Sequence, residues 1–203
     1  LQPRALEIES LAIARSLVKN EIASQDMLLI DIGANRTSFI IFSGYSIRFT
    51  SSIPISGHGL NKVISESLSV SLEKAEKMKI KYGLKGTGER GKKVAEVLHP
   101  SFQILIDEIN KHLDFYKTHG QNKKGSLSAG GSGIEKIILC GGGASLIGLT
   151  DYLNNKLKIP VELGNPWVNV LKNPKQKIPL SQEKSLKYAT AIGLALRGIR
   201  EKI

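Results

Sequence analysis

The chain has 203 residues, 41% of them hydrophobic and 5% aromatic, which is typical of a folded α/β protein and excludes a disordered chain. The net charge of +11 comes without a nucleic-acid-binding motif or interleaved aromatic residues, so we favour a solvated surface near an anionic membrane leaflet over nucleic-acid binding. One cysteine excludes an internal disulfide, and no run of about 18 apolar residues predicts a membrane span.

The chain opens with a predicted helix over residues 3–19, whose apolar residues lie almost all round the axis and predict burial. Two apolar, β-rich runs follow at residues 27–30 and 38–42, and the tight turn between them predicts a β-hairpin. A third strand is predicted at residues 46–54. Together the three strands predict a meander.

Periodic apolar residues predict the remaining elements, which are helices at 60–68, 72–82, 102–116, 150–157 and 182–200 and strands at 137–140 and 161–163. Ser71 is expected to cap the helix at 72–82, and Gly83 is expected to end it. Residues 86–93 are predicted to form a polar loop. Residues 119–133 are a low-complexity Gly/Ser/Lys segment, which we interpret as a flexible surface loop.

The turn of the first hairpin carries residue types that suit an anion and its metal ion. It reads Asp31-Ile32-Gly33-Ala34-Asn35-Arg36-Thr37. Gly33 leaves room for backbone N–H groups to approach a phosphate, and Asp31 can hold Mg²⁺ through water. Thr37 can hydrogen-bond a phosphate oxygen. The alternative interpretation is an ordinary hairpin whose aspartate caps the turn.

A cluster of glycines follows the strand predicted at 137–140 and reads Gly141-Gly142-Gly143-Ala144-Ser145-Leu146. Consecutive glycines keep side chains away from the backbone, and a following helix can direct its N-terminus at a ligand. The alternative is a turn needed only for close packing of helix on strand. Neither a Walker A loop nor a Rossmann fingerprint is present. Cys140, at the end of the strand, is expected to be a small buried hydrophobic residue.

These two turns, in this order, resemble the second phosphate motif and the adenosine motif of the actin/Hsp70/sugar-kinase superfamily. The chain also resembles the PilM family, the actin-like proteins of type IV pilus assembly that are related to the division protein FtsA. Five segments carry this resemblance: residues 5–15 (ALEIESLAIAR), the Asp31-Ile32-Gly33-Ala34 turn, and residues 53–57 (IPISG), 165–167 (NPW) and 191–198 (AIGLALRG).

The resemblance implies an α/β fold that is half of an actin-like ATPase, a ribonuclease H-like core with an inserted small helical subdomain. The core is expected at residues 1–59 and 134–203, the inserted subdomain at 60–118, and the loop at 119–133. Only one Asp-x-Gly hairpin is present, so we expect the chain to be the C-terminal half. The last helix is expected to cross the hinge between the two halves at Gly193.

The resemblance further implies that ATP and Mg²⁺ bind in a cleft between the halves. It places Asp31, Gly33, Ala34, Asn35 and Thr37 around the phosphates, with Asp31 holding Mg²⁺ through water. It places the adenosine at the following residues: Glu76 and Lys79 on one helix face, and Gly141, Gly142, Gly143, Ala144 and Leu146 after the strand. Without the resemblance, a Glu/Lys pair at this spacing is ordinary helix surface. Arg36 departs from the usual turn sequence and is expected either to contact a phosphate or to project into solvent.

The implied function is nucleotide binding by a cytoplasmic assembly protein at the inner face of the cytoplasmic membrane. The implied partner is the short cytoplasmic tail of a pilus inner-membrane protein similar to PilN, which in the family docks mainly on the first half. The alternatives are an FtsA-like filament-forming protein of cell division and, less favoured, a sugar-kinase-type phosphotransferase. Self-association and ATP hydrolysis stay open; we expect at most weak ATPase activity, and none from one half alone.

Overall fold

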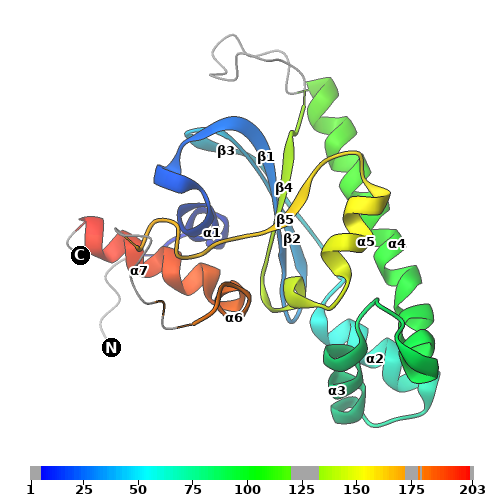
Figure 1. Ribbon diagram of the computed structural model, residues 1–203. Helices are drawn as coiled ribbons and strands as arrows, with labels where there is room; N and C mark the ends of the chain where they lie inside the picture. The colour runs from blue at the N-terminus through cyan, green and yellow to red at the C-terminus, as the bar shows by residue number, and fades with distance from the viewer. Residues whose placement is uncertain (1–5, 120–132, 172–177, 179, 202–203) are drawn as a thin grey trace.

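A computed structural model describes residues 6–119, 133–171, 178 and 180–201, and a five-stranded mixed sheet in the order β3-β2-β1-β4-β5 forms its centre (Figure 1). The strands are β1 (Ala23–Ile32), β2 (Thr37–Gly44), β3 (Ser46–Ile53), β4 (Lys136–Cys140) and β5 (Val161–Leu163). The first three pair antiparallel as the predicted meander, and β4 joins β1 in parallel, as β5 joins β4. The predicted strands are therefore confirmed.

Helices cover both faces and one end of this sheet. Figure 1 shows α1 and α7 on one face, α4 and α5 on the other, and α2 and α3 beside the lower part of α4. Their bounds are α1 (Glu9–Leu17), α2 (Gly57–Leu68), α3 (Leu72–Tyr82), α4 (Gly88–His119), α5 (Leu149–Lys156), α6 (Gln182–Ser185) and α7 (Ala189–Glu201), with short 3₁₀ turns η1 (Lys19–Glu21), η3 (Gly142–Ser145) and η4 (Leu186–Tyr188).

The central strands are buried on both faces. Leu28, Leu29 and Ile30 are fully buried although successive side chains point to opposite sides of the sheet. Helices on both faces explain this continuous apolar run. The strand β3 lies at the edge, and its residues alternate between exposed and half-buried. The rigid part of the sheet is therefore β1, β2 and β4, and it leads directly into both glycine-bearing turns.

The helices α1 and α7 cross at Gly193. A Cβ added there would lie 1.8 Å from the Ala12 carbonyl oxygen, so only glycine permits this approach. The Arg15 guanidinium donates a hydrogen bond to the Gly193 carbonyl at 3.2 Å. The close approach expected from the small residues of the last helix is therefore present.

Several predicted bounds need correction. The helix α1 begins at Glu9 and is not buried all round, because Ile8 before it is 69% exposed and Leu11 is 42% exposed. The predicted last helix is interrupted, since α6 and η4 precede α7. The predicted polar loop at 86–93 is wrong from Gly88 onward, where α4 begins.

The start of α4 is polar in sequence, yet it packs closely. A Cβ on Gly91 would lie 3.3 Å from the Tyr82 ring, so this helical turn sits against the end of α3. Ser71 caps α3 as predicted by accepting a hydrogen bond from the Lys74 N–H, and Gly83 follows it with φ of +53°.

The long helix α4 belongs to both predicted parts of the chain. Its first half packs near α3, whereas the His112 ring in its second half packs at a tilt against Phe39 and Phe49 of the sheet. The division into a core and an inserted subdomain therefore stays a prediction. The predicted flexible loop lies almost entirely outside the described residues. No helix in the described part of the chain combines the length and apolar character needed to cross a membrane.

Candidate functional site

The two glycine-bearing turns meet at the carboxyl ends of β1 and β4. These strands are parallel neighbours, with Asp31 paired to Cys140. Gly141 follows with φ of +83°, and a Cβ on it would lie 2.2 Å from Asp31 Oδ1. Glycine is therefore required here both by the backbone conformation and by the carboxylate beside it. Residues far apart in the sequence form one site at the end of the sheet.

Asp31 is the most perturbed carboxyl group of this site. Burial and, to a smaller extent, the nearby Glu9 raise its pKa to about 6, and this value includes the opposing effects of a hydrogen bond from Cys140 and the charge of Arg36. Burial also raises the pKa of Cys140, which therefore stays a neutral thiol. Cys140 is buried and free, as predicted. Asp31 is half-buried, and a divalent cation would stabilise its charged form.

The turn between β1 and β2, residues 33–36, is called the phosphate turn after its predicted role, and it is held against the N-terminus of α2. The Gly57 N–H donates to the Gly33 carbonyl at 2.9 Å, and the His58 N–H donates to the Ala34 carbonyl at 3.0 Å. The Asn35 Oδ1 lies 3.1 Å from His58 Nδ1. These contacts use the carbonyl side of the turn. The turn is therefore held in place before any ligand arrives.

The backbone N–H groups at the tip of the same turn make no such contacts among the described residues. Among the described residues, the backbone N–H groups of Ala34, Asn35 and Arg36 donate to no carbonyl oxygen. Successive free N–H groups in a turn can bind an anion. Arg36 itself turns away, and its guanidinium lies 2.8 Å from the Glu9 carboxylate at the start of α1.

Thr37 takes a different position from the one predicted. It is fully buried, and its hydroxyl donates a hydrogen bond to the Ile55 carbonyl at 2.8 Å. This arrangement argues against the predicted phosphate contact, because the hydroxyl already has an acceptor and is shielded from ligand. We therefore correct its role to joining β2 to the segment that precedes α2.

Lys79 reaches from α3 to Gly57, the first residue of α2, and Gly57 bonds the phosphate turn. Its ammonium donates to the Gly57 carbonyl at 2.8 Å, and a Cβ on Gly57 would lie 3.5 Å from the Gly33 carbonyl oxygen. Burial lowers the pKa of Lys79, while Glu76 acts in the opposite direction. Glu76 is exposed. The sequence pattern did not indicate that Gly57 joins Lys79 to the turn, although residues 53–57 carried part of the resemblance.

The glycine cluster after β4 is not uniformly open. Gly143 packs on Ile32, since its Cβ would lie 2.3 Å from Ile32 Cγ2, and Ala144 is buried. Leu146 is half-buried and packs against the core. A Cβ added to Gly142 would have one described neighbour within 4 Å, the Lys187 Cβ at 3.8 Å. Of these residues, Gly142 therefore presents the most open backbone to a ligand.

The end of α3 also contacts the segment after η3. The Leu84 N–H donates to the Ile147 carbonyl at 2.8 Å, and a Cβ on Gly83 would lie 2.2 Å from that oxygen. Lys79 of α3 therefore contacts Gly57, which bonds the phosphate turn, and the residues that follow α3 contact Ile147, which comes directly after the glycine cluster.

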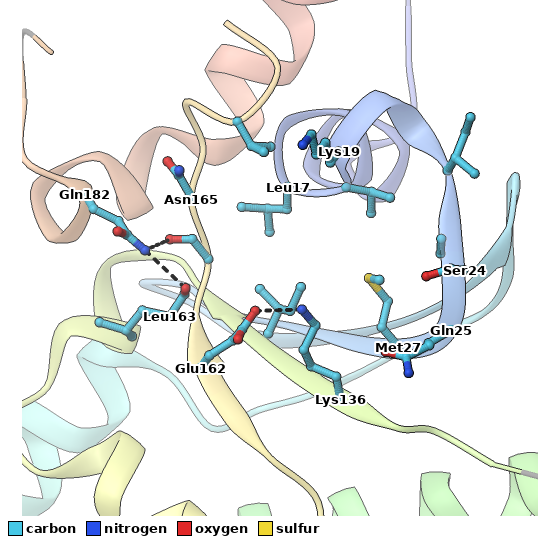
Figure 2. A pocket seen from close by; sticks show the side chains of 16 residues that line it. Leu17, Lys19, Ser24, Gln25, Met27, Lys136, Glu162, Leu163, Asn165 and Gln182 are labelled. Carbon is cyan, nitrogen blue, oxygen red and sulfur yellow. Dashed lines mark hydrogen bonds and ion pairs between the residues drawn. The ribbon is translucent and has the colours of Figure 1, made fainter. Parts of the chain in front are cut away.

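A separate pocket of about 600 Å³ lies at the opposite end of the sheet, where β1 and β4 begin (Figure 2). Lys136 pairs with Glu162 across it at 2.8 Å, and Gln182 donates to the Gly164 carbonyl at 2.9 Å. None of the predicted nucleotide-binding residues lines it. The pocket and the candidate site are therefore distinct.

Within the described residues, no group of three or more His, Cys, Asp and Glu side chains could hold a metal ion. Mg²⁺ commonly keeps several waters and binds through one or two carboxylates and substrate phosphates, and Asp31 fits that requirement.

Comparisons with known proteins give a consistent picture. A family model described as type IV pilus assembly protein PilM matches residues 1–199. A solved structure of a PilM-PilN type IV pilus biogenesis complex matches with a TM-score of 0.77 and 27% identity, covering 98% of this chain and 54% of that chain. MreB5 of Spiroplasma citri bound to AMPPNP matches with a TM-score of 0.68 and 17% identity, covering 97% and 60%, which shows the fold alone.

Among curated proteins, the cell division protein FtsA of Pseudomonas aeruginosa is 26% identical over 220 residues, covering 96% of this chain and 47% of that protein. The chain therefore spans about half the length of this relative. These similarities confirm the predicted α/β, actin-like fold.

Proposed function

The chain belongs to the PilM family of type IV pilus assembly proteins, and from this membership we propose that it forms one wall of an ATP site in the pilus assembly machinery. The observation that carries the proposal is the meeting of Asp31, Gly141 and the phosphate turn at one end of the sheet. A carboxylate, successive free N–H groups and a side-chain-free backbone supply the three kinds of contact that Mg·ATP requires.

Each residue has a distinct proposed role. The N–H groups of Ala34, Asn35 and Arg36 bind phosphate oxygens, and Asp31 holds Mg²⁺ through water. Lys79 adds a positive charge beside the turn, and the Gly142 backbone lies against the adenosine. Lys79 is suited to this position because its hydrogen bond is to a neutral carbonyl, which leaves its charge available to a phosphate.

ATP would contact three separate segments of the protein at once. The phosphate turn belongs to the sheet, Lys79 belongs to α3, and Gly142 begins η3. A ligand that contacts all three favours one arrangement of them, and a partner that prefers this arrangement would sense the nucleotide. We propose that the partner is the cytoplasmic tail of a PilN-like inner-membrane protein, which places the protein in the cytoplasm at the inner face of the membrane.

The proposal includes little or no hydrolysis by these residues alone. Hydrolysis needs a positioned water and fixed charges around the γ-phosphate. The site described here supplies binding contacts from one wall, and the opposing wall is expected from a second half. We therefore propose binding first and, at most, weak ATPase activity.

Calorimetry of Mg·ATP binding to the full-length protein tests the site. In a Gly142→Asp variant the new carboxylate meets the nucleotide, so binding should weaken at least tenfold. The substitution should not disturb the fold, because the nearest side-chain atom is 3.8 Å from the added Cβ. Gly198→Asp is the matched control, since among the described residues no atom outside the helix's own backbone lies within 4 Å of a Cβ there. Unchanged affinity in Gly142→Asp would refute the assignment.

The similarity to FtsA supports a second candidate, a filament-forming protein of cell division. The two functions differ in what they require of the full-length protein. Sedimentation with and without Mg·ATP detects filaments, and a binding assay with the PilN-like tail detects the pilus function. Nucleotide-dependent filaments without tail binding would favour the second candidate.

A further inference from the structure

Arg36 of the phosphate turn is held by a residue outside the proposed ATP site. Its Nη2 lies 2.8 Å from Glu9 Oε2, and both side chains are exposed, 61% and 44% respectively. Glu9 is the first residue of α1. The pair therefore joins the turn proposed to bind phosphate to the helix that crosses α7.

The contact with Glu9 uses only part of the hydrogen-bonding capacity of the Arg36 guanidinium. A guanidinium carries five N–H donors in a planar fork that suits a phosphate, and one short contact to Glu9 is found. An exposed pair of this kind is weak, since solvent screens it and two long side chains must be ordered. A nucleotide phosphate carries more charge than one carboxylate and accepts two parallel hydrogen bonds, so it competes effectively.

The position of Arg36 allows its side chain to leave Glu9 for a phosphate without a change in the backbone of the turn. Its own backbone N–H is one of the free N–H groups of the turn, and its carbonyl is fixed by the Gly33 N–H at 3.0 Å. The backbone therefore stays in place while the side chain rotates. Only the rotation of one exposed side chain separates the contact with Glu9 from a contact with a ligand beside Ala34 and Asn35.

We propose that Arg36 binds a phosphate group of the nucleotide and that Glu9 competes for its guanidinium in the nucleotide-free protein. This inference rests on the proposed ATP site. Nucleotide binding then releases the Glu9 carboxylate, whereas Glu7 keeps the N-terminal end of α1 in place through its ion pair with Arg15.

The test is a double-mutant cycle on Mg·ATP affinity in the full-length protein, at one fixed ionic strength because salt screens such contacts. Arg36→Gln should weaken binding by roughly tenfold to a hundredfold, the range of a charge-assisted hydrogen bond. Glu9→Gln should tighten binding about 1.5- to 5-fold, the range of an exposed ion pair that no longer competes. In the double variant that gain should vanish, because no guanidinium is left to release.

Glu162→Gln is the matched control. Glu162 forms an equally short pair with Lys136, also at 2.8 Å and partly exposed, at the opposite end of the sheet. It should leave Mg·ATP affinity unchanged, and thermal unfolding should show that all variants remain folded.

The outcomes separate the two proposals. If wild-type protein binds no Mg·ATP, the proposed function itself fails. If it binds and Arg36→Gln has no effect, or Glu9→Gln has no effect, the competition between Glu9 and phosphate is refuted. An equal gain from Glu9→Gln with and without Arg36 also refutes it, since that gain reflects only general repulsion between Glu9 and the nucleotide.

Discussion

Asp31 should make the nucleotide-free protein less stable at neutral pH, so its replacement should be stabilising. We consider Asp31→Asn, which keeps the size of the side chain and an oxygen that can accept the Cys140 hydrogen bond. Burial, reinforced by Glu9, raises the pKa of Asp31 from 3.8 to about 6. The folded state therefore disfavours the charged carboxylate, and the asparagine removes that charge.

The magnitude follows from the pKa. One pKa unit corresponds to about 1.4 kcal/mol, so the rise to about 6 costs the folded protein at most about 3 kcal/mol once Asp31 is ionised. The folded pKa lies above the unfolded one, so stability is fully present below pH 3.8 and is lost as pH rises to about 6. The advantage of Asp31→Asn should be near zero at pH 4 and largest above pH 6.

Urea unfolding at pH 4.5, 6 and 7.5, with a chelator and without nucleotide, measures this difference through the fluorescence of Trp167. Asp114→Asn, an exposed carboxylate on α4, is the control and should show no comparable gain. The same Asp31→Asn variant should bind Mg·ATP more weakly. A variant that is no more stable than wild type at pH 7.5 would show that Asp31 has another stabilising partner and would refute the reasoning.

Three further predictions concern packing and titration. Gly193→Ala should destabilise the protein by roughly 2–4 kcal/mol in chemical unfolding, because its Cβ would meet the Ala12 carbonyl, whereas Gly198→Ala should be neutral or stabilising by up to about 1 kcal/mol. Thr37→Val should lose about 1–2 kcal/mol of stability without weakening Mg·ATP binding, since the hydroxyl bonds Ile55; a large loss of affinity would restore the phosphate contact. Burial lowers the pKa of His112, so stability is fully present above pH 6.5 and falls below it, and His112→Phe should reduce that loss in thermal unfolding between pH 5 and 7.

The strands and turns were predictable because local chemistry determines them. Buried strands such as β4 are short continuous apolar runs, and Ser71 and Gly83 are the residue types that begin and end helices. The helix at residues 88–93 could not be predicted in the same way. Its polar, glycine-containing sequence favours a loop, and packing of Gly91 on Tyr82 overrides that preference.

The residues of the candidate site also divide into those that local sequence predicts and those whose role depends on tertiary contacts. The two turns could be identified because glycines and a carboxylate after strands are local patterns. The burial of Thr37 and the Glu9–Arg36 pair depend on which distant segments lie beside the turn. A hydroxyl in a turn gives no indication of whether its acceptor is a ligand or the Ile55 carbonyl. For the same reason, the sequence placed Lys79 on the correct helix without indicating that it reaches Gly57.

Burial disfavours the charged forms of two groups of the candidate site, and this favours a role in ligand binding. Asp31 is half-buried with a pKa raised to about 6, and Lys79 is half-buried with a lowered pKa beside the neutral Gly57 carbonyl. Keeping either group charged costs free energy that a purely structural turn would avoid. The N–H groups of Ala34, Asn35 and Arg36 belong to exposed residues, so water can satisfy them and they add no such cost. A divalent cation would stabilise the carboxylate and a phosphate would stabilise the ammonium, so one ligand that carries both would relieve both costs.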